Sequence, residues 1–135
     1  MSMTKMSEYT ITPTPRPTLE NRADLKEYLS NTLYETTIIK LTASWCGPCK
    51  KIAPYVNQMN QEYSKNHSFE YIELDVDECL DLYAFFKKMK MANGVPTFLC
   101  FKKRLVDPDH YYVPYQCITG ADPRGLQNFY QASFS

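Results

Sequence analysis

The sequence predicts an α/β fold in which a central mixed β-sheet of four to five strands is flanked by four helices. Strand and helix patterns alternate from residue 36 onward, which predicts a parallel strand pair joined by a crossover helix. Two later strand patterns joined by a turn-rich segment predict an antiparallel hairpin. Hydrophobic residues make up 44% of the 135 residues, so we expect one domain with an ordinary core over residues 18–135.

Residues 1–17 have the composition of an arm. Residues 9–12 (Tyr-Thr-Ile-Thr) have the pattern of a short edge strand. The run from Pro13 to Pro17 excludes a central strand or a helix interior, because proline has no backbone N–H to donate. We therefore expect a partly flexible arm that contains at most one edge strand.

The first helical pattern covers residues 18–33 and leads into a strand. Thr18 is predicted as the N-cap, and Leu25, Leu29 and Leu33 recur at helical spacing. Residues 36–43 are rich in β-branched and apolar side chains, which predicts a buried strand.

A longer helical pattern follows residue 45 and ends at residue 67. Its apolar residues lie three to four positions apart: Ile52, Val56, Met59 and Tyr63. Residues 69–76 then have the pattern of a second strand. This strand–helix–strand order predicts the parallel pair.

The remaining patterns complete the sheet and its helices. Residues 79–91 predict a helix with Leu82, Phe86 and Met89 on one face. Residues 96–102 and 111–119 predict the two strands of the hairpin. Asp122 is predicted to cap a last helix, whose apolar residues are Leu126, Phe129 and Tyr130.

Charge and hydropathy give no sign of a nucleic-acid or membrane partner. Lys and Arg number 15, as do Asp and Glu, so the formal net charge is zero. The sequence contains no run of about 18 apolar residues that would span a bilayer and no signal-peptide pattern. We expect a cytoplasmic or other reducing intracellular compartment, where cysteines are more often catalytic or metal-binding than structural.

Cys46 and Cys49 are the only close pair among the five cysteines. Cys46 lies where a strand pattern changes to a helix pattern, so its thiol faces unpaired backbone N–H groups and the positive end of the helix dipole. Both lower a thiol pKa from its free value of about 8.5 and favour the thiolate, which is the attacking species in disulfide exchange. Cys49 lies on the same helical face and can attack a mixed disulfide held on Cys46. Gly47 allows a close approach of the chain, and Pro48 fits the first turn.

Two other interpretations of the pair remain. A Cys-x-x-Cys pair is half of a structural zinc site, but no second pair and no suitably spaced His pair is present, so we expect no metal. A structural disulfide fits poorly with a reducing compartment. We expect no cofactor besides the Cys46–Cys49 disulfide. The isolated cysteines, Cys79, Cys100 and Cys117, are expected to be small core residues, and Cys79, near a helix start, to be the most reactive of them.

The segment at residues 45–54, Trp-Cys-Gly-Pro-Cys-Lys-x-Ile-Ala-Pro, resembles the active-site segment of thioredoxins. Residues 94–98, Gly-Val-Pro-Thr-Phe, resemble the family's segment before its third main strand, in which the proline is cis. Gly120 resembles the family's glycine after the last strand. The resemblance covers residues 18–133 in element order and implies a thioredoxin fold.

The resemblance also implies roles for individual residues. Cys46 would be the exposed nucleophile and Cys49 the shielded resolving thiol, with Trp45 packed beside them. Pro96 would be cis and face the disulfide, where it offers no N–H that could block the site. An extended substrate segment would bind in strand-like fashion near three residues: Val95, Thr97 and Gly120.

The implied function is a protein-disulfide reductase that takes electrons from another reductase and passes them to protein disulfides. The opposite direction of electron flow, as in an oxidase or isomerase, is an alternative. Another is a binding subunit or scaffold in which redox activity is secondary, because one fold can serve several functions.

The sequence departs from the family in two places. Lys40 occupies the position of a buried Asp, and Glu73 that of a Lys on the next strand. We hypothesise a reversed pair beneath the active site in which Lys40 tunes Cys49, either by Coulomb attraction or as a base; alternatively, one or both side chains point into solvent. The segment from residue 101 to 120 is also longer than usual. Its tyrosines, Tyr111, Tyr112 and Tyr115, either pack against the core or form a homodimer or partner surface.

Overall fold

The computed structural model describes residues 18–120 and 122–135. The predicted arm at residues 1–17 lies outside these residues. The main elements in chain order are α1 (Arg22–Asn31), β1 (Thr36–Thr42), α2 (Gly47–Tyr63), β2 (Phe69–Asp75), α3 (Leu80–Lys88), β3 (Thr97–Lys102), β4 (Gln116–Thr119) and α4 (Pro123–Ser133).

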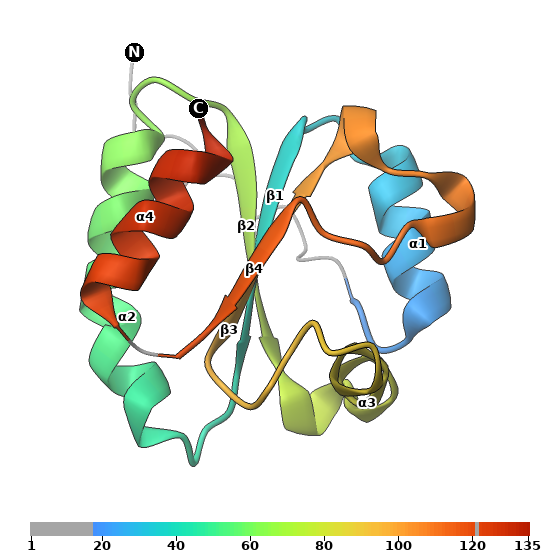
Figure 1. Ribbon diagram of the computed structural model, residues 1–135, viewed down its shortest axis with the longest axis horizontal. Helices are drawn as coiled ribbons and strands as arrows, with labels where there is room; N and C mark the ends of the chain where they lie inside the picture. Colours follow the sequence, from blue (N-terminus) through green and yellow to red (C-terminus); the bar gives the residue numbers. More distant parts are fainter. Residues whose placement is uncertain (1–17, 121) are drawn as a thin grey trace.

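The strands form one sheet in the order β2-β1-β3-β4. β1 and β2 are parallel, from Thr36 opposite Phe69 to Thr42 opposite Asp75. β3 is antiparallel to both β1 and β4. Helices α2 and α4 cover one face of the sheet, and α1 and α3 cover the other (Figure 1). The predicted crossover unit, hairpin and two helical layers are confirmed.

Apolar residues form two clusters, one on each face of the sheet. Along β1, Ile39 and Leu41 belong to the cluster beneath α1 and α3, and Ile38 belongs to the cluster beneath α2 and α4. Because side chains alternate along a strand, Lys40 lies on the same face as Ile38. A lysine therefore occupies a core position beneath α2.

The first helix differs from its prediction at both ends. Its N-cap is Asn21, whose side chain accepts the backbone N–H of Asp24 at 2.9 Å, and not Thr18. The helix ends at Asn31, so Leu33 lies beyond it and is 95% exposed. The apolar spacing continued past the point where the backbone leaves the helix.

The helix α3 and the strand β4 are shorter than predicted. α3 ends at Lys88, which leaves Met89 beyond the helix and 40% exposed. β4 begins only at Gln116, because the preceding residues form 3-10 turns at 103–105 and 108–110 and a further turn. Pro114 in that segment cannot donate to a strand ladder. No helix in the described part of the chain is both long and apolar enough to cross a membrane.

Candidate redox site

Cys46 and Cys49 form a disulfide where β1 leads into α2. Their Cα atoms are 5.3 Å apart, within the usual range for a disulfide. Cys46 is the N-cap of α2, and its Sγ accepts the backbone N–H of Cys49 at 3.1 Å. The sulfur therefore takes the place of a capping oxygen and faces the positive end of the helix dipole. This arrangement favours negative charge on Cys46 once the disulfide is reduced.

The two cysteines are buried to a similar extent. Cys46 is 3% exposed and Cys49 is 2% exposed, so the expectation of an exposed Cys46 is wrong for the disulfide form. The Val95 carbonyl oxygen lies 3.7 Å from the Cys46 Sγ, because the loop before β3 packs over it. Gly47 and Pro48 are exposed beside the pair.

The loop that faces Cys46 is held by its own hydrogen bonds. The Val95–Pro96 peptide bond is cis, as expected. The Gly120 N–H donates to the Pro96 carbonyl at 2.9 Å, which ties this loop to the end of β4. Gly120 has a φ of +125°, which favours glycine at this position.

Thr97 does not present its side chain to the surface. It is fully buried, and its hydroxyl donates to the Gly94 carbonyl at 2.7 Å and lies 2.7 Å from the Thr119 hydroxyl. Thr97 was expected among the substrate-binding residues, but its side chain instead holds the loop that carries Val95. Its burial depends on the pairing of β3 with β4, which the local sequence pattern does not reveal.

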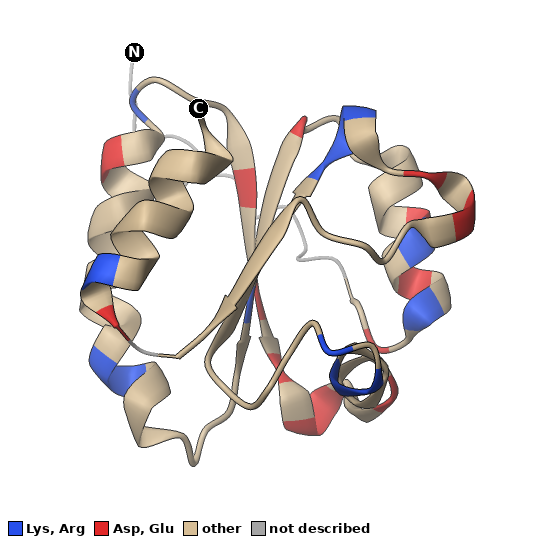
Figure 2. Ribbon diagram, in the orientation of Figure 1, with Lys and Arg blue, Asp and Glu red and all other residues tan. Residues whose placement is uncertain are grey.

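Trp45 lies on the surface beside the disulfide and is 66% exposed. Its indole N–H donates to Asp77 Oδ2 at 2.9 Å. Asp77 belongs to a group of acidic residues between β2 and α3 (Figure 2). This contact was not predicted. The acidic residues directly after a parallel strand were a usable signal for it, because parallel strands end at the same edge of the sheet.

Lys40 and Glu73 are opposite residues on β1 and β2. The Lys40 Nζ lies 4.0 Å from Glu73 Oε2 and donates to the Cys49 carbonyl at 3.3 Å. The Lys40 side chain is 3% exposed and that of Glu73 is 41% exposed. The geometry thus contains the hypothesised reversed pair, and the alternative in which Lys40 points into solvent is wrong. Burial lowers the pKa of Lys40, while the Glu73 charge acts in the opposite direction.

Comparison with known proteins identifies the family. The family model described as Thioredoxin matches residues 18–113. The chain belongs to the thioredoxin family. Together, the family and the Cys46–Cys49 pair indicate a thiol–disulfide oxidoreductase.

Mammalian thioredoxins are among the similar proteins. Thioredoxin of the horse, Equus caballus, is 33% identical over 85 residues, which cover 63% of this chain and 74% of that protein. Human thioredoxin is 32% identical over 85 residues, with the same shares of both chains.

Solved thioredoxin structures have the same fold. The structure of Plasmodium falciparum thioredoxin has a TM-score of 0.59 at 25% identity and covers 84% of this chain and 95% of its own. The structure of Fasciola hepatica thioredoxin has a TM-score of 0.60 at 23% identity and covers 85% of this chain and 96% of its own.

Two of the other three cysteines of this thioredoxin-family chain, Cys79 and Cys100, are buried as expected. Cys79 is buried, and burial, with the nearby acidic residues Asp75, Glu78 and Asp77, raises its pKa to about 11. Burial and the raised pKa both disfavour the thiolate, which argues against Cys79 as the most reactive of the three. Cys100 is buried as expected, whereas Cys117 is exposed on β4 and is not a core residue. Among the described residues, no group of three or more His, Cys, Asp or Glu side chains could hold a metal ion.

The tyrosines before β4 mainly pack against the protein itself. Tyr111 and Tyr112 are partly buried against the core beneath α1 and α3. The rings of Tyr112 and Phe85 meet edge to face with centroids 4.9 Å apart. Tyr115 is 49% exposed. The packing interpretation is thus correct for Tyr111 and Tyr112.

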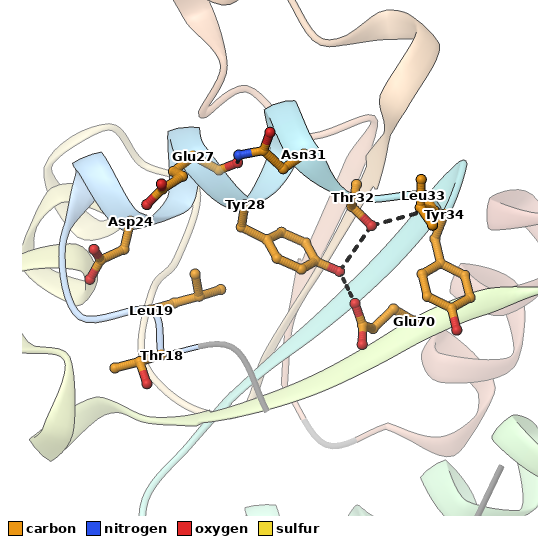
Figure 3. A pocket seen from close by; sticks show the side chains of 10 residues that line it. All are labelled: Thr18, Leu19, Asp24, Glu27, Tyr28, Asn31, Thr32, Leu33, Tyr34 and Glu70. Atoms are coloured by element: carbon orange, nitrogen blue, oxygen red, sulfur yellow. Dashed lines mark hydrogen bonds between the residues drawn. The ribbon is translucent and has the colours of Figure 1, made fainter. Parts of the chain in front are cut away.

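A pocket of about 510 Å³ lies between α1 and the start of β2 (Figure 3). The Tyr28 hydroxyl donates to Glu70 in this pocket, and burial, followed by that hydrogen bond, raises the pKa of Tyr28 to about 12. Glu70 pairs with Thr37 near the start of β1, whereas Cys46 follows the end of β1. The pocket is therefore separate from the redox site.

Proposed function

We propose that this protein reduces protein disulfides by dithiol exchange through Cys46 and Cys49. The contact between the Cys46 Sγ and the Cys49 backbone N–H carries this proposal, because a sulfur that accepts a helix N-terminal N–H is stabilised as a thiolate. Membership of the thioredoxin family and the intact Cys-Gly-Pro-Cys segment support it.

The reaction takes place in two exchanges. In the first, the reduced Cys46 thiolate attacks one sulfur of a substrate disulfide, the Cys46–substrate bond forms, and the other substrate sulfur leaves as a thiolate that takes up a proton. In the second, Cys49 loses its proton and attacks the Cys46 Sγ, which releases the remaining substrate thiol. The chain gives two electrons to the substrate and ends with the Cys46–Cys49 disulfide; of the two protons that the substrate thiols take up, one is equivalent to the Cys49 thiol proton and the other comes from water.

We assign the surface around Cys46 to substrate binding. Trp45, Gly47 and Pro48 are exposed beside the pair, and Val95 is half-buried next to the Cys46 Sγ. An extended substrate segment would lie along the Val95 and Gly120 backbones by strand-like pairing. Thr97 would contribute by holding the loop in place.

The active domain is proposed to cover residues 18–135. The family match ends at residue 113, but α4 buries Leu126, Phe129 and Tyr130 against the sheet face that also carries Lys40. The protein would work in a reducing intracellular compartment. There, an electron-donating reductase would regenerate the dithiol after each cycle.

An insulin-reduction assay tests the proposal. The wild type is expected to reduce insulin with dithiothreitol as electron donor, and Cys46→Ser and Cys49→Ser are expected to be inactive. Cys117→Ser is the matched control, because Cys117 is free and exposed outside the site, and it should keep full activity. An inactive wild type would rule out the reductase function. Equilibration with glutathione would then measure the reduction potential and distinguish a reductase from an oxidase.

A further inference from the structure

Lys40 is a buried cation whose neighbours beneath α2 are largely apolar. It is 2% exposed and lies on the sheet face that α2 and α4 cover with residues such as Ile52, Val56 and Phe129. An ammonium group is costly to bury unless it is paired and hydrogen-bonded. The groups that contact the Lys40 ammonium therefore indicate which negative charges it stabilises.

The ammonium of Lys40 lies between a carboxylate and the resolving cysteine. Nζ donates to the backbone carbonyl of Cys49 at 3.3 Å and lies 4.0 Å from Glu73 Oε2. The Glu73 side chain is 41% exposed and also accepts the Tyr71 hydroxyl at 2.7 Å. Water screens the charge of Glu73, whereas the Lys40 charge acts through the protein interior, where Coulomb interactions are stronger. Of this pair, the positive charge of Lys40 is therefore the less screened one near Cys49.

We propose that the Lys40 ammonium stabilises the thiolate that Cys49 forms in the second exchange. This inference rests on the proposed function, because that exchange requires Cys49 to lose its proton. As the Cys49 thiolate attacks the Cys46 Sγ, the Cys46–Cys49 bond forms and the bond to the substrate sulfur breaks. The electron pair leaves on the substrate sulfur, which takes up a proton from water. Lys40 acts through Cys49 and is a positioning residue, whereas Cys46 and Cys49 are the catalytic ones.

The α2 and α4 face carries another buried cation, Lys102, which lies at the Thr36 end of β1, away from the disulfide. Tyr130 on α4 and Cys100 on β3 both have pKa values raised mainly by burial. The raised pKa values favour the neutral forms of both groups. Lys40 and Glu73 are the charged pair at the Cys49 end of the facing strands, and they act with opposite signs.

Because Lys40 and Glu73 carry opposite charges, removing each should shift the Cys49 pKa in opposite directions. A merely structural role of Lys40 predicts no such pattern. The Cys49 pKa is measured by NMR titration of its Cβ in a Cys46→Ala background, where the disulfide cannot form. Lys40→Met is expected to raise that pKa by about one unit, a roughly tenfold loss of thiolate at a given pH. Glu73→Gln is expected to lower it, because the negative charge is removed. Glu73 is partly exposed, so Glu73→Gln should fold and give a Cys49 pKa even if Lys40→Met does not fold.

Lys102→Met is the matched control. Lys102 is 8% exposed, its Nζ donates to Thr36 Oγ1 at 2.8 Å, and it lies at the other end of β1 from the disulfide. Its loss should leave the Cys49 pKa unchanged. Three results would overturn the proposal. They are no rise of the Cys49 pKa in Lys40→Met, a rise in Glu73→Gln as well, or a rise in Lys102→Met as large as that in Lys40→Met. The titration needs no substrate, so its outcome is independent of the insulin assay.

Discussion

The three free cysteines have environments that determine their reactivity. Cys79 and Cys100 are buried, and burial raises the pKa of both thiols. Cys117 also has a raised pKa, but it is exposed on β4. Because a reagent needs both access and a thiolate, exposure should decide the order in which they react.

Alkylation should therefore modify Cys117 before Cys79. With iodoacetamide at neutral pH, we expect Cys79 to react more slowly by about tenfold or more, since a group with a pKa of about 11 is almost wholly protonated there. Raising the pH toward that value should accelerate the reaction of Cys79, because the thiolate then forms. Peptide mass spectrometry after timed quenching measures both rates, with denatured protein as the control for full labelling. Equal rates in the folded protein would contradict this prediction.

At the scale of the helices and strands, the sequence located most elements but not their ends. Periodic apolar residues predicted α1 and α3, yet Leu33 and Met89 continue the spacing beyond the last helical turn and are exposed. The ends depend on capping contacts and on the direction the chain takes afterwards, neither of which apolar spacing reports. The predicted fourth strand began too early, because aromatic residues favour strands and also pack in turns.

The cap of α1 provides a test at this scale. Asn21→Ala is expected to destabilise the protein by about 1 kcal/mol, because the Asp24 N–H loses its acceptor at the start of the helix. Thr18→Ala is the matched control and should change stability by less than about 0.5 kcal/mol, since Thr18 precedes the cap. Urea unfolding measures both. A larger loss of stability in Thr18→Ala than in Asn21→Ala would show that Thr18 is the N-cap.

Across the whole molecule, the redox site lies where the edge of the sheet meets both layers of helices. Cys46 and Cys49 belong to the apolar cluster of the α1 and α3 face, whereas Lys40 approaches Cys49 from the α2 and α4 face. Cys46 thus lies at a helix N-terminus, and a buried cation contacts the backbone of Cys49 from the other face of the sheet. The Pro96 loop, held by Gly120, completes the surroundings of Cys46.

The sequence predicted those parts of the site that short sequence segments specify. The Cys-x-x-Cys spacing located the disulfide, and the resemblance to thioredoxins paired Lys40 with Glu73. The burial of Cys46 and Thr97 was not predicted, because it results from loops and strands that are far apart in the sequence. The contact between Trp45 and Asp77 has the same origin.

Trapping the mixed disulfide tests the central claim, that Cys46 attacks and Cys49 resolves, most directly. Reduced Cys49→Ser is incubated with a peptide that contains one disulfide, and the adduct is located by mass spectrometry. We expect one peptide thiol bound covalently to Cys46, because the second exchange has lost its nucleophile. Cys46→Ser should form no such adduct at comparable times. An adduct on Cys49 in Cys46→Ser, formed as fast as the one on Cys46, would contradict the assignment of the two roles.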